Sequence, residues 1–171
     1  VLDLHPYTKT SGGHLVPDGY PKGAPEGLID DLKKVRLVTL KYNDAQKPMI
    51  STEFGYTDSS GDLANNPSGP ITPLIKAQYL VRGLVLQYAL GFKKVYIYSF
   101  WDEGQDPFYT EHGFGILDYD LQKKPAFYAI KTLGEQLGEC VLEKPLDGCS
   151  LPSFGYLFRN INSNENVAIV W

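Results

Sequence analysis

The stretch MISTEF, at residues 49–54, decides the fold of this chain. Its mixture of apolar and β-prone residues, ending in a glutamate, predicts a short strand. The segments on both sides are helical in pattern. Apolar residues recur at helical spacing within residues 25–43, and Thr72 followed by Pro73 is a strong helix start, with Gly91 as the stop signal.

Two more strands lie further out. They are predicted at residues 1–5 (VLDLH) and 95–101 (VYIYSFW), and a third helix begins at Pro125. The resulting order of strand, helix, strand, helix, strand, helix predicts a parallel β/α architecture. This order alone does not separate a barrel from a doubly wound sheet.

The tail of the chain has a different pattern. Side chains alternate along residues 154–158 and 167–171, and the segment 160–166 between them is polar and turn-prone, which predicts a β-hairpin. We therefore divide the chain into residues 1–139, the β/α part, and residues 140–171, a linker and a partial all-β module. A three-stranded parallel sheet and half of a β module would leave open strand edges, which isolated domains avoid. We therefore expect this chain to be a fragment cut at both ends.

The composition is that of a soluble globular protein, with 43% hydrophobic and 21% charged residues and a formal net charge of -4. Lysine and arginine form no run, so we expect no nucleic-acid partner. No apolar stretch reaches the roughly 20 residues that span a bilayer, so we expect no membrane partner. Aromatic residues are frequent, at 13% with 12 tyrosines, which suits a sugar-binding cleft and an aromatic-rich core equally.

The two cysteines, Cys140 and Cys149, are close in sequence. If the protein is secreted, they could close a small disulfide loop, and the alternative is two unrelated reduced thiols. The compartment is therefore left open, with an extracellular one favoured by the disulfide alternative.

In parallel β/α folds, functional residues gather where strands end and loops begin. Side-chain alternation predicts Ser51 and Glu53 on one face of their strand, and Ser99 and Trp101 on one face of theirs. His5 ends the first strand. We therefore expect His5, Glu53 and Trp101 to point towards a common mouth.

Glu53 is the central candidate. An acidic side chain at the end of a hydrophobic strand is unfavourable unless it is hydrogen-bonded or used. A carboxylate in this place can attack an anomeric carbon and form a covalent glycosyl-enzyme. The alternative is a glutamate that ties down a loop or faces solvent, and position alone does not decide between the two.

Four segments resemble the large clan of retaining (β/α)8-barrel glycoside hydrolases. They are, in chain order, LDLHPY at 2–7 (the sixth strand), ISTEFGY at 50–56 (the nucleophile strand), YSFWD at 98–102 (the eighth strand), and GFGILD at 113–118 with KPAF at 124–127 (the closing segment). The resemblance spans residues 1–137, and the tail resembles the β module that often follows such barrels. It implies a partial TIM barrel, about the last three β/α units, plus the start of a β-sandwich-like module.

The resemblance also implies roles for single residues. Glu53 would be the nucleophile, and His5 and Tyr7 would hydrogen-bond to it or to the substrate. Trp101 would form the floor of the subsite for the cleaved sugar, and Tyr56 would reach the cleft. The alternatives are structural: a buried histidine, a core aromatic, and surface packing. No metal and no cofactor is implied.

One departure from the clan concerns the general acid/base, which is the Glu of an Asn-Glu pair at the end of the fourth strand. The pair Asn164-Glu165 lies instead in the tail turn. A retaining mechanism needs two carboxyl groups about 5–5.5 Å apart. We therefore expect this chain alone to be incomplete, and to need the missing N-terminal half of the barrel as its partner.

The function expected is hydrolysis of O-glycosidic bonds in a β-linked glycoside or polysaccharide with retention of configuration. The sequence does not choose the sugar or the linkage. The alternative is a non-catalytic carbohydrate-binding or scaffold protein with a barrel fold. A third possibility, a doubly wound nucleotide binder, finds no support because no Gly-rich strand-to-helix fingerprint is present.

Overall fold

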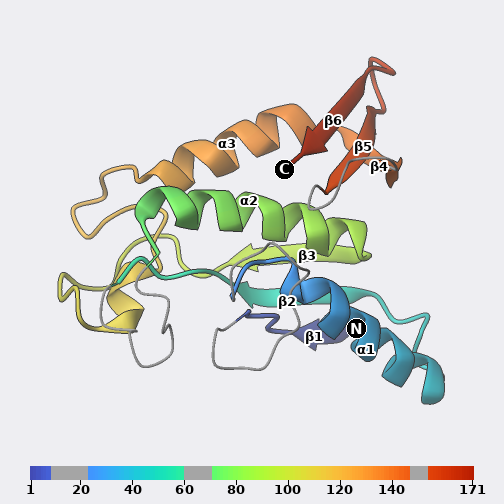
Figure 1. The fold of residues 1–171 in the computed structure, drawn as a ribbon, viewed down its shortest axis with the longest axis horizontal. Coiled ribbons are helices and arrows are strands. Elements are labelled where there is room, and N and C mark those ends of the chain that lie inside the picture. The colour runs from blue at the N-terminus through green and yellow to red at the C-terminus, as the bar shows by residue number, and fades with distance from the viewer. Residues whose placement is uncertain (9–22, 60–70, 147–153) are drawn as a thin grey trace.

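The computed structural model describes residues 1–8, 23–59, 71–146 and 154–171 (Figure 1). The helices and longer strands follow one another along the chain as β1 (Leu2–Leu4), α1 (Gly27–Lys41), β2 (Met49–Phe54), α2 (Pro73–Ala89), β3 (Phe92–Ile97), α3 (Pro125–Leu137), β4 (Cys140–Pro145), β5 (Gly155–Asn160) and β6 (Asn166–Val170). The predicted alternation of strand and helix up to α3 is confirmed.

Strands β1, β2 and β3 form a parallel sheet in that order. Leu4 is aligned with Ser51, and Ser51 with Val95. The register of β2 against β3 shifts between Ser51 and Phe54, so the regular pairing is interrupted in this part of β2. Glu53 lies within this interrupted part.

The helices cover one face of the parallel sheet. In Figure 1, α2 lies along the sheet, and α3 packs on the side of α2 that faces away from the sheet. The core joins apolar residues of the strands to apolar residues of α1 and α2: Leu28, Leu32, Met49, Phe54, Ala77, Leu80 and Phe92. Phe54 is completely buried, and its ring packs against the backbone of α2 at Gly83, where an added Cβ would lie 2.2 Å from the ring.

The predicted assignment of side chains to sheet faces was wrong for β2 and β3. Ser51 is fully buried, and Val95 and Ile97 pack against the core on the helix side. The opposite face carries the polar or exposed side chains of Asp3, His5, Thr52, Lys94 and Tyr96. The apolar side of each strand faces the helices. A prediction that takes the direction of the glutamate for the whole strand therefore assigns the neighbouring side chains to the wrong face.

Strand β3 is also shifted from its predicted position. It starts at Phe92 and ends at Ile97, whereas residues 95–101 were predicted. The peptide bond between Tyr98 and Ser99 is cis, and Trp101 joins only an isolated bridge to Leu117. The predicted placement of Ser99 and Trp101 on one strand face therefore does not hold.

The tail forms a separate antiparallel sheet in the order β4-β5-β6. The predicted hairpin is confirmed as β5 and β6, whereas β4, which pairs with β5, was not predicted. Trp171, just after β6, donates its indole N–H to Glu26 Oε1 (2.8 Å), and Arg82 of α2 pairs with the same fully buried carboxylate. This carboxylate links the tail to α1 and α2.

Two further expectations concern the membrane and the cysteines. None of the helices within the described residues is long and apolar enough to cross a bilayer. The thiol of Cys140 donates to the carbonyl of Gln136 (3.4 Å). Cys149 lies outside the described residues, so the disulfide stays a prediction.

Candidate active site

Three side chains predicted from the sequence meet at the carboxyl ends of β1 and β2. The Tyr7 hydroxyl donates to Glu53 Oε2 (3.3 Å), and His5 Nδ1 lies 3.5 Å from the same oxygen. The side chains of His5 and Glu53 are 50% and 43% exposed, so the carboxylate is held on one side and open to solvent on the other. The geometry suits a carboxylate that must be oriented and still reach a ligand.

Local structure explains this convergence. The Ser51 hydroxyl donates to the backbone carbonyl of Glu53 (3.0 Å) within the irregular end of β2. The side chain of Glu53 therefore does not share the helix-facing side of the strand with Ser51. On β1, His5 Nε2 and Asp3 Oδ1 both contact Thr52 Oγ1, at 2.9 and 2.7 Å. Thr52 thereby fixes the imidazole beside the carboxylate.

Tyr98 and Glu111 also belong to this site, and neither was predicted from the sequence. The Tyr98 hydroxyl donates to Glu111 Oε2 (3.0 Å). The rings of Tyr7 and Tyr98 both pack edge-on against Phe114, with centroid distances of 6.3 and 5.2 Å. The site is therefore an array of two carboxylates and two phenols around one phenylalanine.

The signal for Tyr98 was present in the sequence. Lys94, Tyr96 and Tyr98 are two residues apart, and they form the polar phase that alternates with the apolar Val95 and Ile97. If Val95 and Ile97 are assigned to the core face, Tyr98 falls on the opposite face, at the mouth where His5 and Glu53 were expected. Glu111 lies in the 3-10 turn Thr110–Gly113, and no sequence pattern pointed to it.

The electrostatics keep both phenols protonated. Burial, followed by the charge and the hydrogen bond of Glu53, raises the pKa of Tyr7 well above its ordinary value of 10.0. Burial, followed by the hydrogen bond and charge of Glu111, raises the pKa of Tyr98 to about 12, and the charge of Glu53 acts in the same direction. Both hydroxyls therefore act as hydrogen-bond donors at neutral pH.

Within the described residues, neither of the other two predicted substrate-binding residues, Trp101 and Tyr56, shares a hydrogen bond or ring contact with Glu53, Tyr7 or His5. Trp101 is 50% exposed and packs edge-on against Phe100, and among the described residues no hydrogen bond or ring contact joins it to Glu53. Tyr56 is 7% exposed, and its hydroxyl shares a hydrogen bond with Thr8 Oγ1 (2.8 Å). Its ring packs in the core against Phe54 and Tyr79, so the structure places it inside the protein rather than in a cleft.

Within the described residues, no group of three or more His, Cys, Asp or Glu side chains could hold a metal ion. What the array offers chemically is one solvent-open carboxylate, two phenolic donors and an imidazole. These groups can orient a nucleophilic carboxylate and bind hydroxyl groups of a ligand.

Comparison with solved structures shows that the fold of this chain is similar to a known one. A family 39 glycoside hydrolase from the gut symbiont Bacteroides cellulosilyticus WH2 matches 99% of this chain with a TM-score of 0.68 at 21% sequence identity. The fold is similar to part of a glycoside hydrolase. The chain corresponds to 33% of the length of that protein.

Two other matches are weaker. A Faecalibacterium prausnitzii beta-glucuronidase has a TM-score of 0.44 at 15% identity, over 68% of this chain and 20% of its own. A Rhizomucor miehei beta-1,3-glucanosyltransferase has a TM-score of 0.41 at 20% identity, over 65% of this chain and 47% of its own. No protein-family model and no curated protein matches the sequence.

Proposed function

We propose that the chain is part of a retaining glycosidase that hydrolyses a β-linked glycoside or polysaccharide, with Glu53 as the nucleophile. The observation that carries the proposal is the convergence of Tyr7 and His5 on Glu53 Oε2 at the carboxyl ends of two parallel strands. Active sites of β/α barrels lie at this end of the sheet. The likeness to the fold of a family 39 glycoside hydrolase supports a partial TIM barrel in residues 1–139 and a partial β module in residues 140–171.

In the proposed first step, Glu53 attacks the anomeric carbon as the glycosidic C–O bond breaks, and a glycosyl-enzyme ester forms. Tyr7 donates to the oxygen of the carboxylate and holds it in line. A general acid protonates the leaving oxygen, and we propose that this carboxyl group comes from the part of the barrel that these three strands do not include. Water then hydrolyses the ester, so two inversions give retention.

We further propose that Tyr98, rather than Trp101, supplies the aromatic wall of the subsite for the cleaved sugar. Tyr98 shares Phe114 as a packing partner with Tyr7, and its pKa responds to the charge of Glu53. Its ring is half-buried and its hydroxyl is fixed by Glu111, which suits stacking on a sugar without side-chain rearrangement.

The test is the hydrolysis of aryl β-glycosides by the full protein that contains this chain, followed by proton NMR of the first-formed sugar. The proposal expects a β-configured first product, and a Glu53→Gln variant slower by a factor on the order of 10³ or more. Glu135→Gln, a change to an exposed glutamate on α3, serves as the control and should retain activity. An α-configured first product would contradict retention, and an active Glu53→Gln variant would remove Glu53 from the role.

A further inference from the structure

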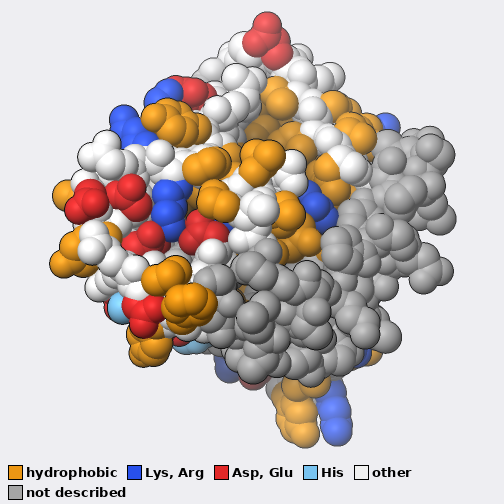
Figure 2. Space-filling model, turned by 60° about the vertical axis from the view of Figure 1, so that its left-hand side comes forward, with side chains coloured by type: hydrophobic (Ala, Val, Ile, Leu, Met, Phe, Trp, Pro, Cys, Tyr) orange, Lys and Arg blue, Asp and Glu red, His pale blue; other side chains and the backbone are white. Residues whose placement is uncertain are grey.

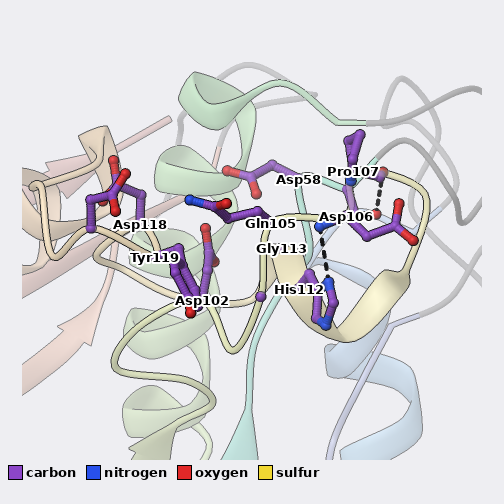
Figure 3. Close-up of a pocket in the computed structure, with 12 residues that line it drawn as sticks. Asp58, Asp102, Gln105, Asp106, Pro107, His112, Gly113, Asp118 and Tyr119 are labelled. Atoms are coloured by element: carbon purple, nitrogen blue, oxygen red, sulfur yellow. Dashed lines mark hydrogen bonds between the residues drawn. The ribbon is translucent and has the colours of Figure 1, made fainter.

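A pocket of about 380 Å³ lies beside the Glu53 site and is not used by the proposed mechanism. Its walls come from the segments after β2 and β3 and from the loop before α3, as Figure 3 shows. These segments lie at the same end of the sheet as Glu53. The volume falls within the range of about 300–1,000 Å³ that is typical of small-molecule sites.

Hydrogen bonds between the loops hold the pocket in shape. The Thr57 hydroxyl donates to the carbonyl of Thr110 (2.7 Å), and the Ser59 hydroxyl donates to the carbonyl of Pro107 (2.7 Å). The fully buried ammonium of Lys76, on α2, also donates to the carbonyls of Gly113 and Gly115. A ligand would therefore enter a site that is largely formed in advance.

One buried oxygen of the pocket, Asp58 Oδ2, accepts no hydrogen bond from the described residues. The side chain of Asp58 is 8% exposed, and its Oδ1 accepts from Lys124 (3.0 Å) and lies 3.6 Å from Lys76. Its second oxygen, Oδ2, is buried, and none of the described residues gives it a hydrogen bond. Figure 3 shows the carboxylates of Asp58 and Asp102 directed towards the space bordered by Gln105. Most buried carboxylate oxygens accept a hydrogen bond, so this oxygen is the atom of the pocket most in need of a donor.

The charges of the pocket disfavour an anionic ligand and provide acceptors for hydroxyl groups, because its lining includes Asp58, Asp102, Asp106, Asp118 and Asp120. Lys124 pairs with both Asp58 and Asp102, and Lys76 lies next to Asp58, so two lysines offset the two buried carboxylates. Figure 2, which brings the left-hand side of Figure 1 forward, shows acidic and basic side chains intermingled on this face. Gln105 adds an amide that both donates and accepts.

The outer wall adds an aromatic ring and further acceptors. Tyr119 is 52% exposed at the rim of the pocket, between Asp118 and Asp120. One oxygen of Asp118 accepts from the backbone of Gln122 (2.7 Å), which holds this loop in place. Carboxylate acceptors, an amide and an exposed ring complement hydroxyl donors and a C–H surface.

We propose that this pocket binds a neutral, hydroxyl-rich ligand, a single sugar unit of a glycan, as a second binding site separate from Glu53. A sugar hydroxyl would donate to Asp58 Oδ2, and Tyr119 would cover a C–H face of the ring. The inference goes beyond the proposed hydrolysis, because a non-catalytic carbohydrate-binding protein could use the same pocket.

The test uses crystals of the full protein soaked with methyl β-D-glucopyranoside or methyl β-D-xylopyranoside, together with dissociation constants from ligand-observed NMR. We expect a sugar hydroxyl within hydrogen-bond distance of Asp58 Oδ2. Tyr119→Ala and Gln105→Ala should each weaken binding about fivefold or more. Tyr128→Ala is the matched control, because Tyr128 is 55% exposed on α3 away from the pocket and its removal should change nothing.

Two further arms separate this inference from the proposed function. Binding in the pocket should persist when Glu53 is blocked by a fluorosugar, and Tyr119→Ala should still form the Glu53 adduct. Sugar bound in the pocket of a protein that never forms the adduct would support the inference while contradicting the proposed function. An ordered water alone at Asp58 Oδ2, or density for calcium from a CaCl₂ soak with no sugar bound, would overturn the inference.

Discussion

At the residue scale, the hydrogen bond from Tyr7 to Glu53 has the most direct chemical consequence. A hydrogen bond to a charged group contributes about 1.5–3 kcal/mol, roughly 10- to 100-fold in a rate if the bond holds the attacking carboxylate. We therefore expect Tyr7→Phe to lower the rate of glycosyl-enzyme formation about 10-fold or more in the full protein. Tyr128→Phe is the control, because Tyr128 is 55% exposed on α3, away from the parallel sheet. Equal rates for wild type and Tyr7→Phe in a stopped-flow burst would refute this role.

A second residue-scale prediction concerns alkaline pH. The pKa of Tyr98 is about 12 in the folded protein and 10.0 ordinarily. Between these values the unfolded phenol loses its proton while the folded one keeps it. The stabilisation is therefore complete below about pH 10 and is lost as the pH rises through 12. Denaturant unfolding from pH 9 to 11.5 should show wild type losing more stability than Tyr98→Phe, and parallel curves would count against the shift.

Sequence reasoning found part of the site at this scale. His5, Tyr7 and Glu53 lie next to strand ends, so their convergence followed from motif and position. Tyr98 was missed because the phase of β3 was inverted, and Trp101 was chosen in its place. Glu111 reaches Tyr98 through a turn in a loop, a contact that no local pattern encodes.

At the element scale, β2 and the start of α2 were predicted to the residue, since alternation and the Thr72 cap are local signals. Thr72 accepts from the backbone N–H of Ile75 (3.2 Å), as an N-cap should. Strand β4 was missed because its sequence, CVLEKP, does not alternate and ends in proline. It forms by pairing with β5, a tertiary effect that sequence patterns do not reveal.

The packing of β2 on α2 gives a matched pair of predictions. At Gly83, an added Cβ would lie 2.2 Å from the ring of Phe54, whereas at Gly134 of α3 no atom lies within 4 Å. Gly134→Ala should stabilise the protein by about 0.5–1 kcal/mol through helix propensity. Gly83→Ala should destabilise it by about 1–3 kcal/mol, because a buried aromatic must move.

Urea unfolding of both variants in the full protein measures these differences. The contrast between the two sites isolates packing, since both substitutions carry the same propensity gain. Equal stabilisation by the two alanines would show that Phe54 does not pack tightly against α2.

At the scale of the whole molecule, the parallel sheet has β1 and β3 as its outer strands within the described residues. Large apolar side chains are exposed around it, among them Leu37, Val38 and Leu40 of α1 and Tyr96 of β3. Open strand edges and exposed apolar groups favour association. We therefore expect the 171-residue chain alone to associate or to unfold without cooperativity.

Sedimentation velocity over a tenfold concentration range, combined with thermal unfolding, tests this expectation. A concentration-dependent increase in mass would agree with it. A monomer with one cooperative transition would contradict it, and would show that three β/α units and the tail sheet suffice for a stable fold.

Trapping the glycosyl-enzyme shows whether Glu53 is the nucleophile. The full protein is incubated with dinitrophenyl 2-deoxy-2-fluoro-β-glycosides, whose leaving group departs with little acid assistance and whose fluorine slows hydrolysis of the ester. Intact mass followed by peptide mapping then locates any adduct. We expect one sugar on the peptide that contains Glu53, and none in Glu53→Gln. An adduct on another carboxylate, or an active protein that forms no adduct, would contradict it.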